Sequence, residues 1–196
     1  MTYATIDQVR RYLDNPNASG DLLIEECIDR SQATIESGTQ RIFEMPTDTT
    51  RKFTLDAVQD ELFVAGRTLY NVLLLDADLC QLTSIQNGDG AVIDLANIIT
   101  NPINATPWSG LCLYDDYWQD DLPGGMIEIT GRWAYSITPP HDIVQACIRL
   151  ATYYHAQKDA QVFDTTAIFE GGVMTIPQGL PRGVYDTIVR YRRHSV

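Results

Sequence analysis

This 196-residue sequence lacks two features that would define its class: a membrane-spanning run and a closely spaced cysteine pair. No apolar stretch approaches the roughly 20 residues that cross a bilayer, and the N-terminus is polar rather than signal-like. We therefore expect a soluble protein made in a cytoplasm. The four cysteines, Cys27, Cys80, Cys112 and Cys147, form no Cys-x-x-Cys pair, which favours buried reduced thiols over disulfides or a metal site.

Motifs for common catalytic chemistries are also missing. The sequence has no Gly-x-x-x-x-Gly-Lys-Ser/Thr phosphate loop and no Gly-x-Ser-x-Gly elbow, and Gly88-Asp89-Gly90 lacks the third glycine of a dinucleotide fingerprint. Only three histidines occur, and His141 and His155 would lie about four turns apart on one helix, too far to share a metal ion. We expect no enzyme, no cofactor and no metal site.

Basic residues are scarce, with 14 Lys and Arg against 26 Asp and Glu and a formal net charge of −12. Affinity for nucleic acid requires a basic face that neutralises phosphates, so DNA or RNA binding is disfavoured. The exception is the end of the chain, with Arg190, Arg192, Arg193 and His194. Two interpretations of these cations weigh equally: favourable pairing with a helix C-terminus, and docking to a partner.

The acidic residues are concentrated in the middle of the chain. Between positions 56 and 121 there are eleven acids and one base, Arg67, whereas the flanking segments are close to neutral. Such a change predicts an acidic module set into a near-neutral frame. An EF-hand does not fit, because aligning its glycine with Gly90 places Ile85 and Ala96 at the terminal ligand positions. We interpret the paired acids Asp115-Asp116 and Asp120-Asp121 as solvated carboxylates.

Helical patterns occupy the N-terminal part and strand patterns the middle. Thr5 with Gln8 is a capping box that predicts a short first helix, and a second helix is predicted from about residue 19 or 21 to Ser37, with Gly38 as its stop. Short apolar or alternating runs predict strands at 52–55, 62–65, 72–75, 82–86, 91–95, 111–114 and 126–133. Asn87-Gly88-Asp89-Gly90 is a hairpin turn signal.

These patterns together predict an α+β fold. A small helical-bundle frame of about four helices, residues 1–50 and 134–196, would carry an inserted antiparallel β module at residues 51–133, which is rich in acids. Residues 160–180 are less regular, and Val173–Ile176 are a candidate for a short strand.

A long helix is predicted after the β module. Thr138 has the position of an N-cap hydroxyl, and Pro139 or Pro140 suits the first turn. Two apolar stripes flank a polar one, so we expect burial on more than one side, including against a neighbouring subunit. The subunit-interface candidates are Val144, Ile148, Arg149 and Thr152.

Four segments form a recognisable combination: Tyr3–Leu13, Asp21–Arg41, Gly131–Ala151 and Gly179–Arg193. In this order they resemble the first, second, core and closing helices of the head-to-tail adaptor (connector) proteins of long-tailed bacteriophages, and of the related adaptors of gene transfer agent particles. The resemblance covers both ends of the chain well and the middle by general layout.

The resemblance implies a structural protein of the virion neck, assembled in the host cytoplasm. Its copies would form a homo-oligomeric ring, dodecameric in the family, between the portal protein and the stopper or tail-completion protein. DNA would pass through without specific binding, since acids repeated around a ring repel phosphates. The implied portal-docking candidates on the last helix are Val184, Ile188, Arg190, Arg192 and Arg193.

This interpretation makes a prediction about the last helix. We expect a chain without residues 182–196 to fold but to lose portal binding.

Two other functions also stay open: another neck ring component, such as the stopper or tail-completion protein, and an enzyme or ligand-binding module that uses the acidic β insertion.

Overall fold

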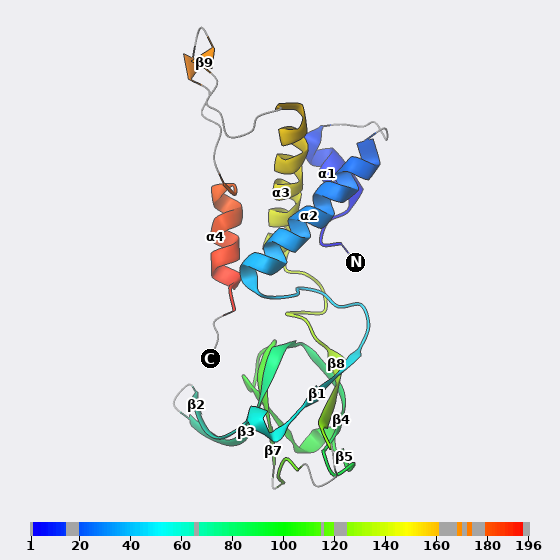
Figure 1. Cartoon of the computed structure of the whole chain (residues 1–196), viewed down its shortest axis with the longest axis vertical. Coiled ribbons are helices and arrows are strands. Elements are labelled where there is room, and N and C mark those ends of the chain that lie inside the picture. Colours follow the sequence, from blue (N-terminus) through cyan, green and yellow to red (C-terminus); the bar gives the residue numbers. More distant parts are fainter. Residues whose placement is uncertain are drawn as a thin grey trace. The chain divides into compact units, whose positions relative to one another are not determined.

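The chain forms two compact units, seen here in a computed structural model (Figure 1). The structure describes residues 2–14, 20–64, 67–114, 116–119, 125–160, 168–169, 172–173 and 179–193. Met1–Arg41 with Pro139–Val196 form a helical unit, and Ile42–Thr138 form a β unit. This architecture confirms the predicted α+β class.

The division between the units differs from the expected boundaries at 50/51 and 133/134. Hydrogen bonds join the two connecting segments to each other, since Tyr135 N–H donates to the Ile42 carbonyl at 2.7 Å and the Ser136 hydroxyl donates to the Phe43 carbonyl at 3.3 Å. The rings of Phe43 and Tyr135 also pack together, with centroids 5.5 Å apart.

Four helices build the helical unit: α1 (Ile6–Leu13), α2 (Asp21–Thr39), α3 (His141–Ala160) and α4 (Arg182–Tyr191). The predicted capping box of α1 is present, since Gln8 N–H donates to the Thr5 hydroxyl and the Gln8 side chain accepts from Thr5 N–H. Figure 1 shows α4 on one side of the α2–α3 pair and α1 on the other.

Two helix boundaries differ from the sequence prediction. α2 runs through Gly38 to Thr39, and the left-handed residue that ends it is Gln40, with φ of 57°. α3 begins at His141, and the Pro140 carbonyl accepts its first helical hydrogen bond from Val144 N–H. Thr138 therefore lies too early to cap α3, and its carbonyl instead accepts from the Ser136 hydroxyl at 2.7 Å.

The β unit contains two antiparallel four-stranded sheets. One has the order β1-β8-β4-β5 and the other β2-β3-β7-β6. The strands are β1 (Thr49–Phe53), β2 (Val58–Val64), β3 (Arg67–Leu79), β4 (Gln81–Gln86), β5 (Val92–Ile93), β6 (Ile98–Asn101), β7 (Trp108–Leu113) and β8 (Ile127–Arg132). Short 3-10 turns, η2 (Leu55–Ala57) and η3 (Leu95–Asn97), precede β2 and β6.

Both sheets contribute to one hydrophobic core, which includes Trp133, Leu73, Leu111 and Ile129. β8 shows why the alternating pattern was informative, since its residues are buried and half-buried in turn. On its outer side Glu128 pairs with Lys52 of β1 at 2.6 Å. Alternation thus places one side of each strand in the core and leaves the other for charges.

The middle of the chain also contained strands that the sequence pattern missed. β6 was not predicted, because its two isoleucines are followed by Thr100 and Asn101 and give too short a run. β3 extends well beyond the predicted 72–75 and contains Asn71 with φ of 51°. In the predicted β4–β5 turn, the residue with positive φ is Gly90.

Some sequence predictions fall outside the described residues. These include the acids Asp115, Asp120 and Asp121, His194 and most of 160–180. Within the last segment the structure describes a short antiparallel pair, β9 (Ile168–Phe169) and β10 (Gly172–Val173). None of the described helices is long and apolar enough to cross a membrane.

A pair of substitutions in α3 tests the assignment of its faces. Leu150 is fully buried and Ile148 is 4% exposed, whereas Arg149 between them is exposed. Ile148→Asp or Leu150→Asp should lower the free energy of unfolding by more than about 3 kcal/mol, because each buries an unpaired charge. Arg149→Ala should change it by less than about 0.5 kcal/mol. Urea denaturation measures both, and equal losses for Arg149→Ala and Leu150→Asp would show that the faces are wrong.

Candidate docking surface of the helical unit

The last helix packs into the helical unit instead of presenting its apolar side to solvent. Val184 is fully buried and Ile188 is 6% exposed, and Thr187 between them is also buried. Two of the five portal-docking candidates, Val184 and Ile188, are therefore covered by their own chain. The structure also argues against the expectation that residues 182–196 are dispensable for folding.

The contact between α2 and α4 is closest at Gly38. A Cβ atom added to Gly38 would lie 2.8 Å from Ile188 Cγ2, a distance that real Cβ contacts do not tolerate. The glycine thus stays inside a helix, where its backbone entropy is unfavourable, because it lets α4 approach α2. Gly38 therefore serves the packing of α4 against α2, and α2 continues past it to Thr39.

The C-terminal end of α4 is attached to both neighbouring helices. The Tyr191 hydroxyl donates to Asp142 Oδ1 at 2.8 Å, and Arg190 Nη1 lies 3.4 Å from Asp142 Oδ2. Arg193 N–H donates to the Thr39 carbonyl at 2.8 Å, at the end of α2. Arg190 therefore has a partner in the same unit, but its side chain stays 65% exposed, so this ion pair contributes little stability.

A groove with a volume of about 570 Å³ lies between α2 and α4. Its walls consist mostly of apolar or small side chains. The residues that line it include Arg30, Ala33, Gly38, Tyr185, Val189 and Arg192. Tyr185 and Val189 expose 57% and 49% of their surface. The guanidinium of Arg30 lies 4.0 Å from the ring centroid of Tyr154 in α3, which fixes the direction of this cation.

Sequence reasoning missed this groove. The signal was a row of small residues on α2 at helical spacing, which includes Ala33, Ser37 and Gly38, next to Arg30. A row of small side chains indicates a close approach of helices, but only the structure shows that α4 covers one part of it and leaves the rest open.

The subunit-interface candidates on α3 differ in how far they are buried. Ile148 is buried within its own unit and is not available to a neighbouring subunit in this structure. Val144 and Thr152 are half-buried, and Arg149 is exposed with a guanidinium nitrogen 3.1 Å from the place of a Cβ on Gly183 in α4. Arg149 therefore remains the accessible member of the set.

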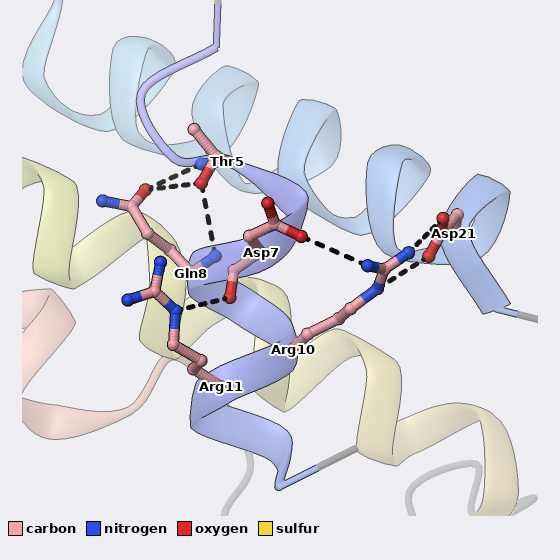
Figure 2. A network of polar contacts seen from close by, with 6 residues as sticks. All are labelled: Thr5, Asp7, Gln8, Arg10, Arg11 and Asp21. Carbon is pink, nitrogen blue, oxygen red and sulfur yellow. Dashed lines mark hydrogen bonds and ion pairs between the residues drawn. The ribbon is translucent and has the colours of Figure 1, made fainter. Parts of the chain in front are cut away.

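The N-terminal end of the unit is held by a polar network (Figure 2). Arg10 of α1 lies between Asp7, at 3.2 Å, and Asp21 at the start of α2, to which it donates two hydrogen bonds. The hydrogen bond to Asp21 raises the pKa of Arg10, and burial opposes this change only in part. Arg11 Nε donates to the Asp7 carbonyl at 3.3 Å. The network joins α1 to α2.

No described group of three or more His, Cys, Asp or Glu side chains has a geometry that holds a metal ion. Acids of the β unit that the structure describes include Asp56, Asp60 and Asp116, all exposed. His141 is exposed and His155 is half-buried at the other end of the same helix. The carboxylates thus supply charge, with no assembled site among the described residues.

The cysteines are buried free thiols, as the sequence predicted. Burial raises the pKa of Cys147 to about 12, and the carboxylates of Asp29 and Glu36 add to this effect. The Cys147 thiol therefore stays protonated at neutral pH and behaves as a small apolar side chain.

The fold is similar to that of chains in solved structures of gene transfer agent (GTA) particles. One chain in the neck of an empty GTA particle, computed with C6 symmetry, matches with a TM-score of 0.62 and 16% sequence identity, over 97% of this chain and 90% of that chain. A chain in the neck of a native GTA particle, computed with C12 symmetry, matches with a TM-score of 0.52 and 17% identity, over 97% and 89%.

A chain in the virion of a native gene transfer agent particle gives a TM-score of 0.52 and 18% identity, over 97% of this chain and 90% of that chain. No family model matches the sequence, and no curated protein matches it. At these identities the likeness shows a shared fold across both units of the chain.

A double-mutant cycle tests the contact between Gly38 and Ile188. Gly38→Ala alone should destabilise the chain by roughly 1–3 kcal/mol through overpacking, although alanine is intrinsically about 1 kcal/mol better in a helix. Ile188→Ala removes the clashing methyl group, so the double variant should be more stable than the sum of the single changes predicts. Additive free energies of unfolding in urea titrations, or a stabilising Gly38→Ala, would contradict the contact.

Proposed function

We propose that this chain is a structural subunit of the neck of a tailed-phage-like particle, and specifically of the adaptor ring that joins the portal protein to the stopper or tail-completion protein. The observation that carries the proposal is a fold match over 97% of the chain to chains in the neck of GTA particles. It agrees with the four helical segments that resemble the adaptor family, which were identified independently of the fold.

The arrangement of α4 supports a role in portal docking. Its C-terminal end presents three arginines, Arg190, Arg192 and Arg193, while Val184 and Ile188 anchor the helix from inside. Because the buried pair holds the helix in place, the arginines would act as a preorganised cationic patch. We propose that this patch, rather than the apolar side of α4, contacts the portal protein.

The distribution of charge supports passage of DNA without binding. The β unit contains fourteen acids and four bases, and the helical unit twelve acids and ten bases. A closed ring repeats this acidic unit in every subunit, and the summed charge would repel phosphates. At moderate ionic strength the repulsion acts within about 10 Å, so it would keep DNA off the protein without stopping its movement.

The same features support a non-enzymatic role in a homo-oligomeric ring. The neck structures that this fold matches were computed with C6 and C12 symmetry, and a dodecameric ring agrees with both. In this proposal the chain needs no cofactor, and its location is the virion, after assembly in the host cytoplasm.

Removal of the gene from a producing strain tests the proposal. Because the portal would lack the ring to which a tail attaches, electron microscopy should show filled heads without tails, and expression of the chain in trans should restore tails. Tailed particles in the absence of the gene would refute the neck assignment. Heads with no ring beneath the portal would be expected if this chain is the adaptor, whereas heads that keep one ring beneath the portal but lack the next would indicate the stopper or tail-completion protein.

The cationic patch is tested by complementation in the same strain. Arg190→Ala with Arg193→Ala should reduce tailed particles by about tenfold, the loss expected when one or two charge-assisted contacts disappear. The matched control is Arg182→Ala, which removes an exposed arginine at the opposite end of α4. Equal particle counts for the patch variant and the control would place portal docking elsewhere.

A further inference from the structure

An acidic stripe with one exposed leucine lies on the N-terminal half of α2. Leu22, Glu25, Glu26 and Asp29 follow the i, i+3, i+4, i+7 spacing that places residues on one side of a helix. Leu22 is 78% exposed, and the three acids are exposed. Within the described part of the chain, none of these acids has an ion-pair partner.

The groove between α2 and α4 has the opposite character. Its walls expose the apolar side chains of Tyr185 and Val189, and two exposed cations, Arg30 and Arg192, line it. Neither cation forms an ion pair with another described residue. An apolar groove with cations beside it fits a leucine flanked by carboxylates.

The stripe cannot fill the groove of its own chain. Both lie on α2, but the stripe centres near residue 25 and the groove near residue 34, a separation of roughly 13 Å along the axis at 1.5 Å per residue. Each copy of the chain therefore presents two different and complementary patches, one on α2 and one between α2 and α4.

We propose that the acidic stripe of one copy docks into the α2–α4 groove of the next copy, with Leu22 as its apolar anchor. This inference rests on the proposed function, because a ring with more than two subunits requires two different patches on every subunit. Leu22 inserts between Tyr185 and Val189, and Glu26 and Asp29 approach Arg30. The contact repeats around the ring and closes it.

Charge reversal tests the docking, and it leaves the three arginines of the cationic patch unchanged. Arg30→Glu reverses the charge at the groove position that Glu26 and Asp29 approach, and Glu26→Lys with Asp29→Lys reverses the charges of the stripe. In a producing strain without the native gene, each variant alone should reduce tailed particles by about tenfold or more, since like charges meet at every contact. Co-expression of the two variants should restore tails, because each reversed patch then finds its complement on the other chain.

The result that would overturn the docking is normal tail formation by either variant alone, or failure of the co-expressed pair although both chains fold. Circular dichroism and thermal unfolding of each purified variant establish folding. These outcomes are distinct from failure of the proposed function, which appears when the strain without the gene already makes tails. Sedimentation of the purified wild-type chain adds a second test, because association that stops at a dimer would indicate a two-fold contact instead.

The leucine anchor has a matched control. Val92 in the β unit is 78% exposed, as Leu22 is. Leu22→Ala should weaken self-association by roughly tenfold, because the truncated side chain loses apolar surface buried in the groove. Val92→Ala should leave self-association unchanged. Equal association constants for the two variants would remove Leu22 from the interface.

Discussion

The close approach of α4 to α2 at Gly38 is the contact on which the rest of the structure depends. It brings the C-terminal helix against α2, because Ile188 occupies the space where any other residue at position 38 would carry a side chain. The N-terminal and C-terminal segments belong to one unit, and the β unit is inserted between them in the chain. The same approach forms the groove from which we derive the contact between copies.

The two units carry different physical properties that suit different tasks. The β unit has most of the excess acid and is stabilised by a core shared between two sheets. The helical unit is nearly neutral, and its surface has separate acidic, cationic and apolar patches. A subunit of this kind can make directional contacts through its helices, while its β unit contributes charge that repeats with the symmetry of a ring.

Local patterns predicted the elements, but they did not predict which surfaces meet. The capping box at Thr5 and the alternation in β8 depend on neighbouring residues alone, so the sequence was sufficient for them. The apolar sides of α3 and α4 were recognised, yet Ile148 and Val184 were assigned to partners, because periodicity cannot tell whether the same chain or another covers an apolar side. Gly38 looked like a helix stop because glycine is common after helix ends, and the sequence does not show that Ile188 approaches it.

A cryo-electron microscopy map of the neck of particles that contain this chain tests the central claim most directly. The account predicts a ring of identical copies between portal and tail, each with a helical unit and a β unit, and with α2 of one copy against the α2–α4 groove of the next. A neck map with no density that fits these two units, or with the chain absent from purified tailed particles, would contradict it.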